Sequence, residues 1–96
     1  MRVMVVHHTP SLTRERYEAV VRGLSGKHRL ESTQDVPTRG LLVHVAAETD
    51  RGFMVIDVFD SQQAFDRFRA VASPIATEAG IEEPPKSFPI HTYISG

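Results

Sequence analysis

Cysteine is absent from this 96-residue chain, which excludes several classes of site at once. Disulfides, thiolate nucleophiles, iron–sulfur clusters and cysteine-based zinc sites cannot be built without it. An excess of either charge is also lacking, because 11 basic and 12 acidic residues give a net charge of −1 with no block of like charge. This balance argues against a nucleic-acid platform and against a helix that lies on a membrane surface.

Long apolar runs are missing as well. A run such as Val3–Val6 is far shorter than the roughly 20 residues that a membrane-spanning helix needs. The N-terminal residues lack the basic segment, apolar stretch and cleavage site of a secretory leader, so we expect a cytoplasmic protein. The composition, 41% hydrophobic and 24% charged, predicts one soluble domain over residues 1–96 with its own core.

The first half of the chain alternates strand and helix signals. Val3–Val6 is β-branched and predicts a strand that Pro10 brings to an end. Thr13 is a suitable N-cap for a helix that stops at Gly26. A polar loop over residues 27–40 follows this helix. The helix has a single apolar stripe, formed by Tyr17, Val20, Val21 and Leu24.

A β-hairpin is predicted after this loop. Its strands cover Leu41–Ala47 and Phe53–Phe59, and residues 49–52 form the tight turn between them. Gly52 is expected to take the positive φ that such a turn requires.

The remaining elements complete a ferredoxin-like order. A helix capped at Asp60 or Ser61 is predicted to break at Pro74, which begins a short further helix closed by Gly80. The last strand is predicted over Phe88–Ile94. The resulting order, β-α-β-β-α-(α)-β, is that of an α+β, split βαβ fold with a four-stranded antiparallel sheet.

The predicted sheet is apolar on both faces, which indicates a homodimer. Helices cover only one face in this architecture, so a monomer would leave a large apolar patch in water. A second copy that packs sheet against sheet about a two-fold axis would cover it. In the third strand, one face carries Met54, Ile56 and Val58, and the other carries Phe53, Val55, Asp57 and Phe59.

The segment Asp57–Phe65 also carries a family resemblance. Its Asp-Val-Phe followed by Asp-Ser-x-x-Ala-Phe resembles the dimeric α/β barrel superfamily, most of all small proteins of the antibiotic biosynthesis monooxygenase type. The resemblance implies that Phe59, where the group often has tryptophan, borders the substrate. It also implies a range of activities, because the superfamily includes cofactor-free monooxygenases of polyketide-type aromatics, cyclases, isomerases and haem-degrading enzymes.

His44 and Asp57 are the polar residues that stand among apolar neighbours on the hairpin strands. The purely apolar face of the third strand should meet the helices, so Asp57 is expected to point away from them into a sheet-lined cavity. If Thr49 pairs with Gly52 around a two-residue turn, His44 stands opposite Asp57. If Gly52 belongs to a three-residue turn with a bulge, His44 faces the helices instead.

Polarity favours the first register, because a buried imidazole needs a partner. A neighbouring carboxylate fixes the tautomer of a histidine and prepares it as a general base. We therefore predict His44 as the base and Asp57 as its partner. The alternative is a structural hydrogen bond that holds the hairpin together.

Further candidates lie on the other strands. His91 is predicted as a third catalytic residue, and Tyr93 as a donor to a developing oxyanion. Val55 shares the face of Asp57 and is expected to contact substrate. His7 and His8 point to opposite faces of the first strand, so one of them is expected to reach the cavity, and the sequence leaves open which.

Neither a metal nor an organic cofactor is expected. Local metal-ligand spacing, a glycine-rich phosphate loop and a dinucleotide motif are all absent. The sequence thus predicts a cofactor-independent biosynthetic enzyme, a monooxygenase, cyclase or isomerase, in which histidine transfers a proton of a small aromatic or polyketide-type molecule. The alternatives are a non-catalytic ligand-binding or stress-response protein, and a haem-binding or haem-degrading protein.

Overall fold

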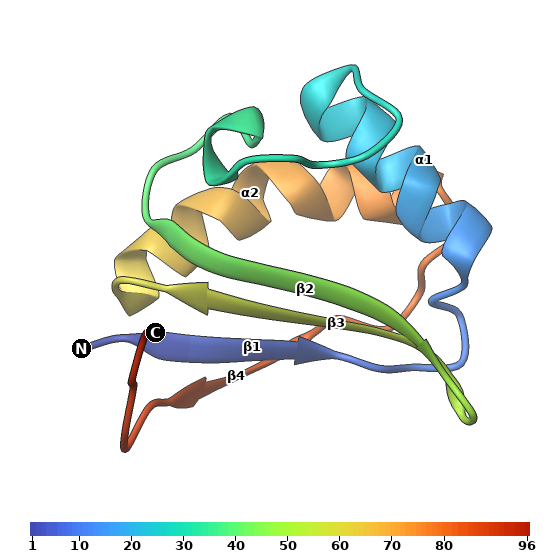
Figure 1. Ribbon diagram of the computed structural model, residues 1–96. Coiled ribbons are helices and arrows are strands. Elements are labelled where there is room, and N and C mark those ends of the chain that lie inside the picture. The colour runs from blue at the N-terminus through green and yellow to red at the C-terminus, as the bar shows by residue number, and fades with distance from the viewer.

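One antiparallel sheet, in the order β2-β3-β1-β4, forms the base of the molecule (Figure 1). The structure is a computed structural model that describes residues 1–96. Two helices and one 3-10 turn (η1) connect the four strands. Their bounds are β1 Val3–His7, α1 Arg14–Ser25, η1 Thr33–Asp35, β2 Leu41–Thr49, β3 Gly52–Phe59, α2 Gln62–Glu78 and β4 Lys86–Pro89.

Both helices cover the same face of the sheet and leave the other face open (Figure 1). This α+β arrangement, with four antiparallel strands and two helices, is consistent with the predicted ferredoxin-like fold. Neither helix combines the length and the apolar character that crossing a bilayer demands.

The predicted ends of α1 are confirmed. Thr13 caps its N-terminus, where the Thr13 hydroxyl accepts a hydrogen bond from the backbone N–H of Arg16 at 3.3 Å. Gly26 ends the helix in the left-handed conformation, with φ of 73°. Ser61 caps α2 in the same way as Thr13 caps α1 and accepts from the N–H of Ala64 at 3.1 Å.

The predicted break at Pro74 is wrong, because α2 continues through this residue to Glu78. Proline removes one intrahelical hydrogen bond, and Pro74 does so on the exposed side of the helix. The next turn is held by packing against α1. A Cβ added at Gly23 of α1 would lie 2.6 Å from Cγ2 of Ile75, so the two helices approach closely there.

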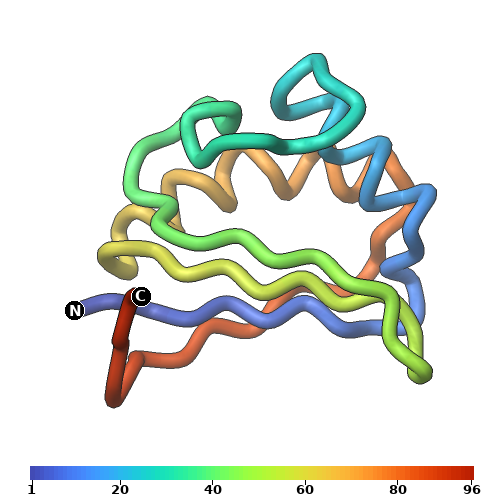
Figure 2. Tube along the Cα trace, in the orientation of Figure 1, coloured from blue at the N-terminus to red at the C-terminus, as the bar shows by residue number.

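The predicted last strand is also wrong in its position, because β4 covers Lys86–Pro89 rather than Phe88–Ile94. Its length is set by β1, and the register that pairs Lys86 with Val6 brings Pro89 opposite Val3, where β1 begins. Beyond Pro89 the chain turns back towards the N-terminal end (Figure 2), and the side chain of Ile94 is 87% exposed.

The helices pack on the face of β3 opposite to the one expected. Phe59 is fully buried beneath them, with its ring centroid 5.5 Å from that of Phe65 and 5.3 Å from that of Phe68. Large aromatic side chains release the most area from water when they are buried, which favours the face that carries Phe53 and Phe59. Asp57 shares this face and therefore points towards the helices.

Candidate active site

The hairpin register places His44 directly opposite Asp57. Thr49 pairs with Gly52 across a two-residue turn, and Gly52 has a φ of 112°, as predicted. A register shift does occur in this pair of strands, but it lies between Leu41 and Val43, beyond the two polar residues. The prediction of a two-residue turn, with His44 opposite Asp57, is thereby confirmed.

His44 is the central member of a chain of three hydrogen-bonded side chains. Its Nδ1 lies 2.6 Å from Oδ1 of Asp57, and its Nε2 lies 2.6 Å from the hydroxyl of Tyr17. A carboxylate only accepts, so Nδ1 carries the hydrogen of the neutral imidazole. The Nε2 lone pair then accepts the O–H of Tyr17. The resulting order, phenol to imidazole to carboxylate, is suited to moving a proton.

Tyr17 comes from the first turns of α1 and was predicted only as a member of the apolar stripe. Its ring is stacked on the imidazole of His44, with centroids 5.9 Å apart, and packs against Phe53 at 5.0 Å. Burial raises the pKa of Tyr17 to about 12, and the charges of Asp57 and Glu18 act in the same direction. Tyr17 is therefore a neutral phenol at physiological pH.

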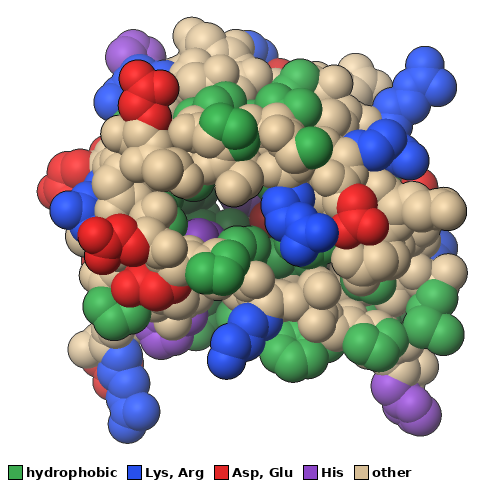
Figure 3. All heavy atoms as spheres, turned by 180° about the vertical axis from the view of Figure 1, so that it is seen from behind, with side chains coloured by type: hydrophobic (Ala, Val, Ile, Leu, Met, Phe, Trp, Pro, Cys, Tyr) green, Lys and Arg blue, Asp and Glu red, His purple; other side chains and the backbone are tan.

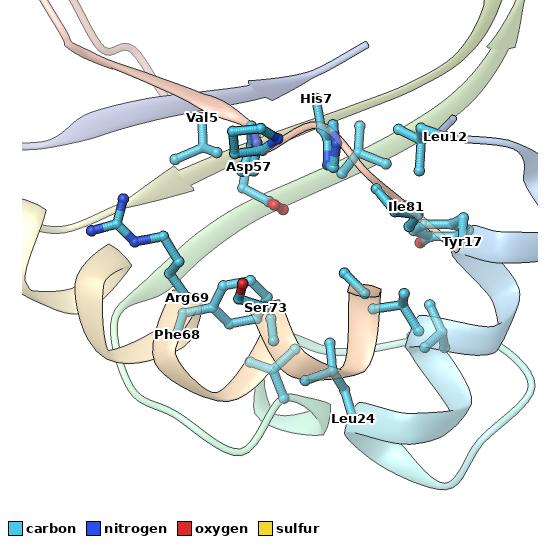
Figure 4. A pocket seen from close by; sticks show the side chains of 18 of the residues that line it. Val5, His7, Leu12, Tyr17, Leu24, Asp57, Phe68, Arg69, Ser73 and Ile81 are labelled. Carbon is cyan, nitrogen blue, oxygen red and sulfur yellow. The ribbon is translucent and has the colours of Figure 1, made fainter. Parts of the chain in front are cut away.

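These side chains line a cavity between the sheet and the two helices, with a volume of about 200 Å³. Most of its walls are apolar. Figure 4 shows Asp57 and His7 on the sheet side of the cavity and Tyr17 on α1. In the space-filling view a hollow leads into the molecule, with a histidine side chain visible inside it and a basic side chain at its edge (Figure 3). The three hydrogen-bonded side chains are thus accessible from an apolar pocket.

The segment between α2 and β4 lies along one edge of this cavity and is tied to the sheet. His7 donates its Nε2–H to the backbone carbonyl of Glu83 at 2.9 Å. The Ser11 hydroxyl donates to the Glu83 carboxylate and accepts from the N–H of Glu82 at 2.8 Å. The hydrogen bonds from Ser11 hold the pKa of Glu83 below its usual value, so this carboxylate is ionised.

The structure brings some of the predicted site residues together and leaves others elsewhere. His44, Asp57, Val55 and His7 all line the cavity, which answers which of the paired histidines reaches it. His8 lies outside, near the hairpin turn, where its Nε2 is 3.3 Å from a backbone carbonyl.

Besides His8, three predicted site residues do not reach the cavity. Phe59 is sealed in the core by the aromatic side chains of α2 and is not a wall of the pocket. His91 is exposed, because β4 ends before it. Tyr93 packs under Arg2, whose guanidinium carbon lies 4.8 Å from the ring centroid. The shorter β4 removes the strand alternation that placed His91 and Tyr93 beside the other candidates.

No group of three histidine, aspartate or glutamate side chains gathers in a way that could hold a metal ion. Comparisons with protein-family models, curated proteins and solved structures found no match to this chain. The geometry of the cavity is therefore the basis for assigning a function.

His7 predicts a pH dependence of stability. Burial holds the pKa of His7 below its ordinary value of 6.5, so below that pH the unfolded chain takes up a proton before the folded one does. We expect the melting temperature to fall as the pH is lowered from 7 to about 5. In His7→Gln this fall should be smaller, whereas in His28→Gln, which changes an exposed loop residue, it should match the wild type. Equal pH profiles for all three proteins would contradict the prediction.

Proposed function

We propose that this protein is an enzyme that moves a proton on a small aromatic or polyketide-type molecule without a cofactor, in a biosynthetic pathway. The observation that carries the proposal is the Tyr17–His44–Asp57 chain at the wall of an apolar cavity. A base, an acid that stays neutral and an orienting carboxylate are the groups that proton transfer requires. The resemblance of the Asp57–Phe65 segment to the dimeric α/β barrel superfamily supports the same class of chemistry.

The proposed reaction begins with a hydroxyl or an acidic C–H of the substrate near the oxygen of Tyr17. As the substrate proton is transferred to this oxygen, the phenol proton passes to Nε2 of His44. Asp57 then stabilises the imidazolium through the Nδ1–H bond. Because the pKa of Tyr17 is about 12, the phenolate does not accumulate, and its O–H remains beside the new substrate anion as a donor.

The fate of the anion distinguishes the possible reactions. Return of the proton from the same chain to another carbon gives an isomer, and attack of the anion on a carbonyl of the same molecule closes a ring. Both outcomes conserve all atoms and electrons, and they need only the groups in the cavity. Oxygenation would use the same anion with dioxygen as a second substrate. The geometry favours isomerisation or cyclisation, because the acid that returns the proton is already in place.

Solvent hydrogen exchange tests the proposal without knowledge of the substrate. Small phenols and cyclic 1,3-diketones are incubated with the protein in D₂O, and loss of their carbon-bound hydrogens is followed by NMR. We expect the protein to accelerate exchange in at least one of them, with no oxygen consumed. A panel that exchanges no faster than in buffer, while NMR shows that its members bind, would instead support a non-catalytic binding protein.

We also propose that the protein forms a homodimer through the open face of the sheet. In the strands, this face presents Met4, Val45, Ile56 and other apolar side chains, and its charged residue is Lys86 at the edge. Several of these side chains are more than one third exposed. A second copy is the occupant that a nearly uncharged apolar face suits best, because a two-fold axis matches the surface to itself.

A further inference from the structure

Arg69 and Ser73 form a polar rim on the α2 side of the cavity. They are four residues apart, so they lie on the same side of the helix, and both line the cavity. Figure 4 shows them together on α2, across the cavity from Asp57 and His7. Arg69 is the only lysine or arginine in the cavity lining. The cavity therefore has one fixed positive charge, and this charge is at its rim.

The guanidinium of Arg69 is held in place but is not saturated. Its central carbon lies over the ring of Phe65, 5.2 Å from the ring centroid, so the two groups form a cation–π contact. One nitrogen is 3.1 Å from Oδ1 of Asp66, and these side chains are 55% and 48% exposed. So exposed a pair contributes little, and the guanidinium has five N–H donors, so it can bind a second carboxylate.

The opposite end of the cavity is unsuited to a preformed anion. Asp57 places its negative charge there, and Tyr17 stays neutral. At the edge, the Glu83 carboxylate is directed to Ser11, whose N–H and hydroxyl both donate to it. Glu82 is exposed to solvent. A negatively charged group on a ligand is thus repelled from the end of the cavity that holds Asp57 and is attracted to Arg69.

We propose that Arg69, assisted by Ser73, anchors a carboxylate of the substrate. The substrate class is then a small aromatic or enolisable acid, with its apolar body in the cavity and a neutral hydroxyl or keto group at Tyr17. The volume of about 200 Å³ is only slightly larger than the roughly 150 Å³ cavity that holds benzene, so one substituted ring fits. The contact at Tyr17 rests on the proposed function, whereas the contact at Arg69 does not.

Two probes of nearly equal shape, one negatively charged and one neutral, test this assignment. 4-Hydroxybenzoate and 4-hydroxybenzamide are titrated into ¹⁵N-labelled protein, and binding is followed through backbone amide shifts. We expect the benzoate to bind about 3- to 5-fold more tightly than the benzamide, which is the upper range of the contribution of a solvent-exposed ion pair. Arg69→Gln should abolish this preference. Arg67→Gln, which removes an exposed charge of α2 outside the cavity lining, should retain it.

Three results would overturn the proposal: equal affinity of the wild type for both probes, equal loss of preference in the two arginine variants, or no saturable binding of either probe. The second would show a long-range charge effect rather than a contact. His44→Asn separates this proposal from the proposed function. This variant should keep the preference for benzoate even though its exchange activity is lost. If the wild type prefers benzoate but catalyses no exchange, the carboxylate contact at Arg69 is supported and the proposed function is not.

Discussion

His44→Asn is expected to lower the rate of catalysed hydrogen exchange by about 10²- to 10⁴-fold, the usual contribution of a positioned general base. Asparagine is chosen because its amide nitrogen can still donate to Asp57 from near the position of Nδ1, while Nε2 and its lone pair are lost. His44→Ala would leave the buried Asp57 carboxylate without its partner and would also cost about 1–3 kcal/mol of stability. Turnover per folded molecule, from NMR exchange rates and unfolding curves, separates the two effects.

Substitutions of Asp57 and Tyr17, the hydrogen-bonded partners of His44, should also lower the exchange rate. Asp57→Asn removes the group that keeps the hydrogen on Nδ1, so the rate should fall by about 10²-fold or more. Tyr17→Phe keeps the packing against Phe53 but deletes the hydroxyl that relays the proton. Its rate should fall to a similar extent with little change in melting temperature.

The matched control is His28→Ala, which removes an exposed histidine of the loop before β2. Its exchange rate should equal that of the wild type. If the three hydrogen-bonded side chains have a purely structural role, the opposite pattern is expected. The variants of His44 and Asp57 would then unfold more easily but, when folded, would catalyse hydrogen exchange at the normal rate. That pattern would overturn the proposed base.

Local sequence signals were sufficient to pair the two hairpin residues with each other, but not to choose the face of the sheet on which they lie. The register depends on the turn between the strands, for which the sequence allows two alternatives. The need of a buried His44 for a polar partner favours the two-residue turn between Thr49 and Gly52, which the structure has. Once the turn is fixed, the pairing of His44 with Asp57 follows by counting along the strands. The caps of α1 were predictable for the same reason, since Thr13 and Gly26 act on the adjacent helical turns.

The choice between the two faces of β3 could not be made from alternation. Each face is largely apolar, and the charge of Asp57 suggested that its face avoids the helices. The structure instead buries Asp57 between the helices and the sheet, where His44 supplies a hydrogen bond. The bulk of Phe53 and Phe59 outweighs the cost of one satisfied carboxylate.

Tyr17 and β4 show the limit set by contacts between distant parts of the chain. The helical period placed Tyr17 on the buried side of α1, but which strand residue it meets depends on how the helix crosses the sheet. The end of β4 depends on where β1 begins, so His91 could not be excluded from the sequence of β4 itself. In both cases the decisive partner lies more than 25 residues away.

The wild-type protein is expected to sediment at micromolar concentration as a dimer, twice its chain mass of 10.7 kDa. The reason is the open face of the sheet, where Met4, Val45 and Phe88 are 36%, 49% and 45% exposed. In a two-fold dimer a substitution enters the interface twice. Val45→Lys would therefore bury two ammonium groups without partners. A buried charge that has no partner costs about 3–5 kcal/mol of the free energy of association.

This cost corresponds to an increase of at least about 10²-fold in the dimer dissociation constant, which equilibrium sedimentation over a concentration series measures. Val71→Lys is the matched control, because Val71 is 40% exposed but lies on α2, on the other side of the sheet. It should leave the dissociation constant unchanged. Both variants should remain folded, since each lysine stands at an exposed position in the monomer. A wild type that sediments at 10.7 kDa, or equal weakening by the two lysines, would show that the open face is not the interface.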